Sequence, residues 1–127
     1  MPERVIETHK VGGVDERLKI LVMDGPGDGG ACHQYVVKED VPPNTETTLP
    51  AYTIKFQKGP IKENGLNGIT QEVLLAIVKD RLEGFQSGDF ACEANQAALD
   101  HVDAALASLQ QRTRDRLSRN VEGTSEQ

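Results

Sequence analysis

The last third of the chain constrains the fold most, because its apolar residues recur at helical spacing in two long runs. In the first run, apolar side chains fall three or four positions apart between Thr70 and Phe85. The same spacing continues in a second run from Leu99 to Leu117. The break at residues 87–89 between them predicts an antiparallel helical hairpin, or a coiled-coil-like dimer.

The ends of the two helices are indicated by single residues. Thr70 is a suitable N-cap for the first helix, because a threonine hydroxyl accepts a hydrogen bond from a free amide of the first turn. The sequence Ser-Gly-Asp at 87–89 ends that helix and can cap the next. The second helix is expected to run from about Phe90 or Cys92 to about Asn120.

The N-terminal half alternates apolar and polar residues, which is typical of half-buried strands. Strands are expected around Val5 and Ile6 and at three further stretches, residues 17–23, 32–38 and 52–57. The predicted fold class is therefore α+β, with a small N-terminal antiparallel sheet followed by a long C-terminal antiparallel helical hairpin, in an oligomer. The predicted boundaries within one compact domain are a β-sheet region with glycine-rich loop and connector at 1–68, the hairpin at 69–120 and a tail at 121–127.

The composition explains why an oligomer is expected. Hydrophobic residues make up 37% of the 127 residues, and the chain has two tyrosines, three phenylalanines and no tryptophan. So few large apolar side chains favour burial of helix faces between chains. The net charge of -6 argues against binding to duplex nucleic acid, which requires a basic surface. No apolar run is long enough to span a membrane, and we expect a soluble, cytoplasmic protein.

Two sequence features suggest chemistry that their context does not support. Gly25, Gly27 and Gly30 match the dinucleotide-binding pattern G-x-G-x-x-G, but a strand pattern follows where a helix is required. A glycine-rich hairpin is the preferred interpretation, with a ligand-binding backbone nest as the alternative. The scattered cysteines and histidines predict no metal site, and no residues form a recognisable catalytic arrangement, so no catalytic residue and no cofactor are predicted.

The second helix ends in a ladder of arginines that share one helix face. Arg112, Arg116 and Arg119 stand at i, i+4 and i+7, with Arg114 between them. One interpretation is structural, with the helix dipole and neighbouring carboxylates balancing the charge. The other is an anion site, and phosphate is the anion that suits arginine best.

Two residues at the hairpin turn favour the anion site. Phe85 ends the first helix and Asn95 begins the second, so both lie far from Arg112 within one chain. They could meet the ladder only across an interface with a second, antiparallel hairpin. Such a site would offer an aromatic ring to stack a base, an amide to read its edge and guanidinium groups for phosphates.

Three runs of sequence carry a resemblance to a known family. They are FQKGPIKENGLNGITQEVLLAIVKDRLEGFQSG, then FACEANQAAL, then LQQRTRDRLSRNVEGT. Together they resemble the phage Thoeris anti-defence sponge family, type one, whose hairpin is shared with the phage anti-CBASS sponge, type two. The resemblance covers residues 52–124, and the preceding stretch DGPGDGGACHQY is similar to the Thoeris family.

This resemblance implies a function and a set of binding residues. Members of the family bind cyclic signalling nucleotides of bacterial immunity without cleaving them, so that the effector stays inactive. The implied ligand is cyclised ADP-ribose, with cyclic di- or trinucleotides at a second site, and the implied assembly is a homodimer or a hexamer of dimers. By position, Phe85 would stack on adenine, Asn95 would contact the ligand, and Arg112 and Arg116 would hold the pyrophosphate.

The resemblance also implies a second ligand site and two further contacts. Arg119, Gly123 and Thr124 would serve the second site, and Lys58 and Lys62 would add positive charge. Two alternatives to a nucleotide sponge stay open. One is a hydrolase of a cyclic nucleotide or an ADP-ribose derivative, and the other is a helical oligomerisation module without a ligand.

Overall fold

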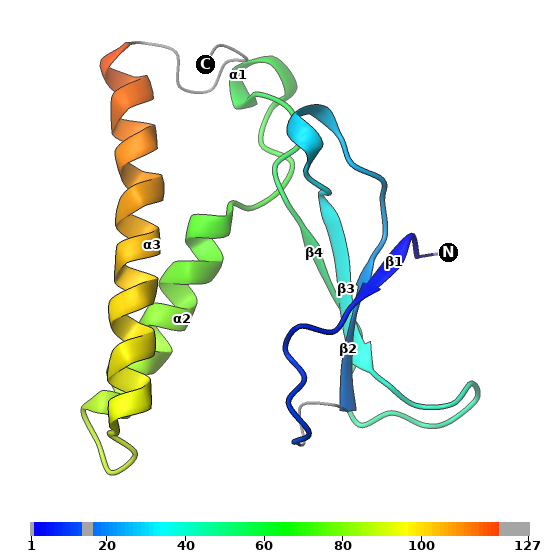
Figure 1. The fold of residues 1–127 in the computed structure, drawn as a ribbon. Coiled ribbons are helices and arrows are strands. Elements are labelled where there is room, and N and C mark those ends of the chain that lie inside the picture. The colour runs from blue at the N-terminus through cyan, green and yellow to red at the C-terminus, as the bar shows by residue number, and fades with distance from the viewer. Residues whose placement is uncertain (1, 14–16, 120–127) are drawn as a thin grey trace. The chain divides into compact units, whose positions relative to one another are not determined.

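A computed structural model describes residues 2–13 and 17–119, and the chain divides into two compact units, Met1–Lys58 and Gly59–Gln127 (Figure 1). The first unit is a four-stranded sheet and the second contains the helices, which confirms the predicted α+β fold class. No helix in the described part of the chain is both long and apolar enough to cross a membrane.

The first unit is an antiparallel meander, with strands in the order β1-β2-β3-β4. The strands are β1 (Arg4–Ile6), β2 (Leu18–Val22), β3 (Gln34–Glu39) and β4 (Tyr52–Lys55). Each strand overlaps a stretch that the sequence predicted as a strand. Val22 is fully buried and lies opposite Tyr35 in the ladder, and the Tyr35 ring meets Phe56 edge-on, with centroids 5.7 Å apart. These contacts form the small core of the sheet unit.

The glycine-rich segment is the connection between β2 and β3, as the hairpin interpretation predicted. It contains one short 3-10 helix, Asp28–Gly30, and Gly29 has a φ of 82°, a backbone conformation that favours glycine. Asp24 closes the loop, because its carboxylate accepts hydrogen bonds from the amides of His33 (2.9 Å) and Gln34 (3.0 Å). The Gln34 amide is the main cause of a lowered Asp24 pKa.

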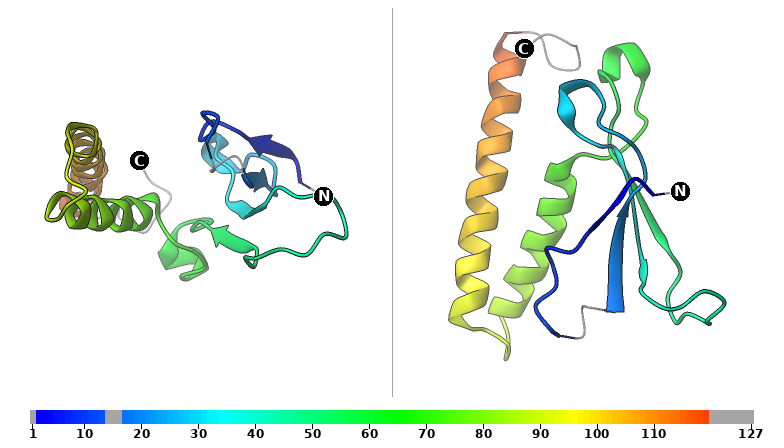
Figure 2. Two further views of the ribbon diagram at one scale, coloured as in Figure 1. Left: turned by 90° about the horizontal axis from the view of Figure 1, so that it is seen from below. Right: turned by 45° about the vertical axis from the view of Figure 1, so that its right-hand side comes forward.

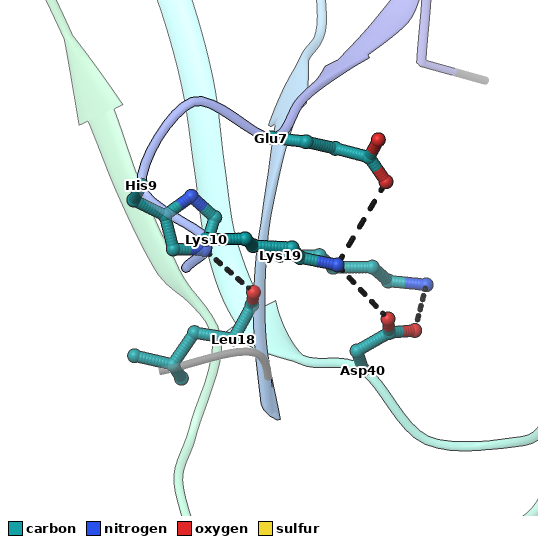
Figure 3. A network of polar contacts seen from close by, with 6 residues as sticks. All are labelled: Glu7, His9, Lys10, Leu18, Lys19 and Asp40. Atoms are coloured by element: carbon teal, nitrogen blue, oxygen red, sulfur yellow. Dashed lines mark hydrogen bonds and ion pairs between the residues drawn. The ribbon is translucent and has the colours of Figure 1, made fainter. Parts of the chain in front are cut away.

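A network of polar contacts joins the segment after β1 to strand β2 and to Asp40, the residue that follows β3 (Figure 3). The Lys10 ammonium lies 3.7 Å from a Glu7 carboxylate oxygen and 3.6 Å from one of Asp40. Lys19 of β2 approaches the other oxygen of Asp40 at 3.7 Å. His9 Nε2 lies 2.9 Å from the carbonyl oxygen of Leu18, so this nitrogen carries the proton and donates it. The network therefore anchors one end of the sheet.

The second unit contains a short helix and a long hairpin. The short helix α1 (Ile61–Asn64) lies in the predicted connector, where no helix was expected. The hairpin consists of α2 (Gln71–Gln86) and α3 (Glu93–Ser118), which pack together next to the turn and diverge toward the start of α2 (Figures 1 and 2). As predicted, the Thr70 hydroxyl accepts a hydrogen bond from the third residue of α2, Val73.

The register of the hairpin is marked by one ion pair between the helices. The Lys79 ammonium lies 3.0 Å from a carboxylate oxygen of Asp103, whose hydrogen bond and charge raise the pKa of Lys79. Leu106 is the buried apolar residue of the α3 seam. By contrast, several apolar residues of the hairpin stay exposed, namely Val73, Ile77, Val78, Phe85 and Leu117.

Candidate ligand-binding site

The turn between α2 and α3 gathers four side chains, Arg81, Phe85, Phe90 and Asn95, which we call the turn cluster. The Phe85 and Phe90 rings are nearly perpendicular, at 78°, with centroids 6.3 Å apart. The Arg81 guanidinium lies over the Phe85 ring, 5.4 Å from its centroid, which is a favourable cation–π distance. The Asn95 amide nitrogen donates a hydrogen bond to the carbonyl of Phe90. The cluster thus combines aromatic surface, an amide and a cation.

Hydrogen bonds between the helix ends hold this turn in shape. Gln86, the last residue of α2, accepts a hydrogen bond from the Cys92 amide at 2.9 Å, and its own amide donates to the Gln96 side chain. Cys92 is the N-cap of α3, and its sulfur accepts a hydrogen bond from the backbone amide of Asn95 at 3.5 Å. The side chains of both helix ends therefore fix the connector, and the position of Phe90 is set before any ligand arrives.

The arginine ladder lies in the part of α3 that α2 does not cover. In an antiparallel hairpin, the numbers of facing residues have a constant sum, which the Lys79–Asp103 pair sets. Residue 71, the first of α2, therefore lies opposite residue 111 (79 + 103 - 71 = 111). Residues 112–118 therefore continue beyond the start of α2, as both ribbon views of the hairpin show (Figures 1 and 2). Arg112 in this segment is exposed.

The two predicted pyrophosphate contacts differ in their surroundings. Arg112 is exposed, whereas Arg116 is buried, with only 6% of its surface accessible, and it has interactions of its own. A ligand that binds both would meet Arg112 at once and would have to exchange existing contacts at Arg116. The sequence pattern treated the two as equivalent, because helical spacing does not show what covers a face.

Within one chain, the structure does not bring the two halves of the predicted site together. Phe85 and Asn95 both belong to the hairpin turn, as predicted. Arg112 follows Asn95 by 17 residues on the same helix (112 - 95 = 17), which corresponds to about 26 Å at 1.5 Å per residue. A single nucleotide-sized site made of all four predicted residues therefore requires a second chain.

The remaining predicted residues are placed only in part. Arg119 is the C-cap of α3, where its amide bonds to the last carbonyls of the helix, whereas Gly123 and Thr124 lie outside the described residues. Lys62 is an exposed residue of α1. Lys58 is exposed at the end of the sheet unit, and its charge contributes to the lowered pKa of Asp24.

Two members of the turn cluster were missed by sequence reasoning. Arg81 stands four residues before Phe85 on α2, and this i, i+4 spacing was a readable signal for a contact. Phe90 lies outside both helices, so no periodicity marked it. In the described part of the chain, no group of three or more His, Cys, Asp or Glu side chains is placed to hold a metal ion.

Comparison with known proteins identifies the hairpin. Residues 51–114 match the family model described as "Acb2/Tad1, hairpin domain". The protein named Thoeris anti-defense 1, from Bacillus phage SBSphiJ7, is 45% identical over 74 residues, which are 58% of this chain and 52% of that protein. The chain thus spans about half the length of the curated relative that it matches. Because the family model covers half of the sequence, including α2 and α3 up to residue 114, the chain belongs to the Acb2/Tad1 hairpin-domain family.

Proposed function

We propose that this protein is a phage anti-defence protein that binds a cyclic immune signal, cyclised ADP-ribose, in the host cytoplasm and sequesters it without cleaving it. Membership of the hairpin family and the name of the phage relative support the anti-defence role. The turn cluster and the arginine ladder support a nucleotide as the ligand, because together they offer a base platform and phosphate contacts.

The observation that carries the proposal is the separation of these two groups along α3. Adenine would stack at Phe85 beside Asn95, and Arg112 and Arg116 would hold the pyrophosphate, yet about 26 Å of helix lies between them. Two hairpins packed antiparallel would place the turn of one beside the arginine segment of the other. A two-fold symmetric dimer of this kind has two identical sites.

The distribution of charge favours the antiparallel arrangement. The half of the hairpin next to the turn, residues 79–103, contains six carboxylates and two cations, whereas residues 71–78 and 104–119 contain two carboxylates and four arginines. The turn end of each hairpin is therefore acidic, at -4 (2 - 6), and the far end basic, at +2 (4 - 2). Antiparallel packing sets opposite charges side by side, and parallel packing would oppose like charges. The exposed apolar residues of α2 provide the surface that such a dimer would bury.

The contacts are sufficient for tight binding. A hydrogen bond to a charged group contributes about 1.5–3 kcal/mol, and base stacking on an aromatic ring about 1–3 kcal/mol. Two arginines that each donate two such bonds, together with one stacked base, thus contribute about 7–15 kcal/mol, a range that includes the roughly 12 kcal/mol of a nanomolar complex when the site is preorganised. The hydrogen bonds that fix the hairpin turn provide part of this preorganisation.

The proposal includes a second site and a larger assembly. Arg119, with Gly123 and Thr124, would bind a cyclic di- or trinucleotide where dimers meet in a hexamer. Lys58 and Lys62 would add positive charge near bound phosphates. These roles rest on the family resemblance of the sequence around each residue.

The test compares two substitutions that each remove one arginine, and so one positive charge, from α3: Arg112→Ala and Arg114→Ala. Arg114 lies two residues further along α3, on another face, and its guanidinium donates to Gln111 at 3.4 Å. By calorimetry, Arg112→Ala should weaken binding of cyclised ADP-ribose by about 100-fold or more, because a bidentate contact is lost. Arg114→Ala should bind like the wild type.

Each other outcome has a distinct meaning. Equal weakening by both substitutions would indicate a general charge effect, and the assigned phosphate contact would be wrong. A wild-type protein that binds no nucleotide while it forms an oligomer would be a helical oligomerisation module, the role that the exposed apolar face of α2 also suits. Release of a linearised product would identify a hydrolase.

A further inference from the structure

Phe90 is the most exposed phenylalanine of the protein, with 75% of its surface accessible. It stands in the connector of the hairpin, between α2 and α3. A phenyl ring contributes to stability only when it is removed from water, so this position gains little from phenylalanine in the isolated chain. Its surroundings indicate what covers it.

The Phe90 ring and the Phe85 ring together form an aromatic corner. Their planes meet at 78°, and their centroids are 6.3 Å apart. A flat base that stacks on the face of one ring that is turned toward the other would contact both rings, because their separation is comparable to the length of a purine. The Arg81 guanidinium already lies over Phe85, which is only 38% exposed. Phe90 therefore presents the larger free aromatic surface of the two.

The backbone of Phe90 is held in place by the residue that would read the base. The side-chain amide of Asn95 donates to the Phe90 carbonyl at 3.2 Å, which leaves the Asn95 side-chain oxygen to accept a hydrogen bond from a ligand. The next helix begins at Glu93, and the Cys92 amide is bonded to Gln86. The ring and the amide are thus positioned relative to each other before binding.

We propose that Phe90 is a second base-contacting residue, which forms the other wall of the adenine site together with Phe85. This inference rests on the proposed function, and it assigns to the site a residue outside both helices. The ligand class is a nucleotide with a purine base. The base would lie in the corner between the two rings, with the Asn95 amide at its edge.

The experiment measures binding of cyclised ADP-ribose to the wild type, Phe90→Leu and Phe90→Tyr by calorimetry, with light scattering to follow the oligomer. Leucine keeps an apolar side chain but removes the aromatic face, whereas tyrosine keeps the aromatic face. Phe90→Leu should weaken binding about tenfold, in the range expected for one base–aromatic stack, and Phe90→Tyr should bind like the wild type. Tyr52→Leu, at a 53% exposed aromatic of the sheet unit, is the control and should bind like the wild type.

A spectroscopic readout separates stacking from a merely structural role. The proton resonances of the bound adenine should shift upfield in the wild type and Phe90→Tyr, and this shift should shrink in Phe90→Leu. Equal affinity and equal shifts in wild type and Phe90→Leu would overturn the inference and leave the proposed function intact. Loss of the oligomer in Phe90→Leu would mean that the ring stabilises the contact between protomers instead of stacking on the base, and it would also overturn the inference. A wild type that binds no nucleotide would refute both.

Discussion

Two variants that each bind the ligand weakly should regain tight binding when they share one dimer. Phe85→Ala removes the aromatic platform at the hairpin turn, and Arg112→Ala removes a phosphate contact at the far end of α3. If each site takes Phe85 from one protomer and Arg112 from its partner, a mixed dimer carries one intact site and one doubly altered site. Complementation therefore reports directly whether the site lies between two chains.

The size of the effect follows from the geometry. Phe85 and Asn95 lie at the turn, and Arg112 is about 26 Å from Asn95 along the helix, so no single chain can form the complete site. Random mixing makes about half of the dimers mixed, each with one intact site of two. The mixture should thus bind about one quarter of the ligand that the same amount of wild type binds, with wild-type affinity.

Calorimetry on proteins co-expressed or unfolded and refolded together measures both the affinity and the number of sites. The matched control mixes Phe85→Ala with the double variant Phe85→Ala/Arg112→Ala, which restores no intact site in any dimer. Mixed dimers that form but bind no ligand would refute the interprotomer site. So would single variants that keep wild-type affinity before mixing.

Two further predictions concern stability. Leu106→Ala should lower the free energy of unfolding by about 2–4 kcal/mol in chemical denaturation, because it opens a cavity in the α2–α3 seam. Leu66→Ala, at a 79% exposed connector residue, should have little effect. Equal losses of unfolding free energy in the two variants would contradict the assigned seam. Asp24→Asn should lower the melting temperature at neutral pH, because the carboxylate accepts hydrogen bonds from the His33 and Gln34 amides and its pKa lies below the usual 3.8. This stabilisation is present above pH 3.8 and is lost as the pH falls through the pKa of the folded protein. The melting temperatures of the wild type and the variant should therefore converge in acid, and a difference that persists unchanged there would contradict the assignment.

The strands and the main helices could be predicted because their signals are local. Alternation over four or five residues marked β2 and β4, and Thr70 marked the start of α2 through its side-chain hydrogen bond to Val73. The short helix α1 gave no periodic signal, because four residues complete only one turn. Its position inside a glycine-rich connector favoured a loop interpretation.

The candidate site could be predicted only as a set of residues, and its geometry remained open. Helical spacing placed Arg112 and Arg116 on one face, but it could not show that Arg116 is buried while Arg112 is exposed. Burial depends on contacts between segments far apart in the chain, which periodicity does not encode. Phe90 was missed for a related reason, because its contact with Phe85 depends on the shape of the turn.

The most direct test of sequestration is to bind the ligand and then release it. Purified protein is mixed with cyclised ADP-ribose, separated from unbound ligand and denatured by heat, and the released molecules are identified by mass spectrometry. The account predicts intact cyclised ADP-ribose at one molecule per chain, since a two-fold dimer has two identical sites. Recovery of a linearised product, or of no nucleotide at all, would contradict it.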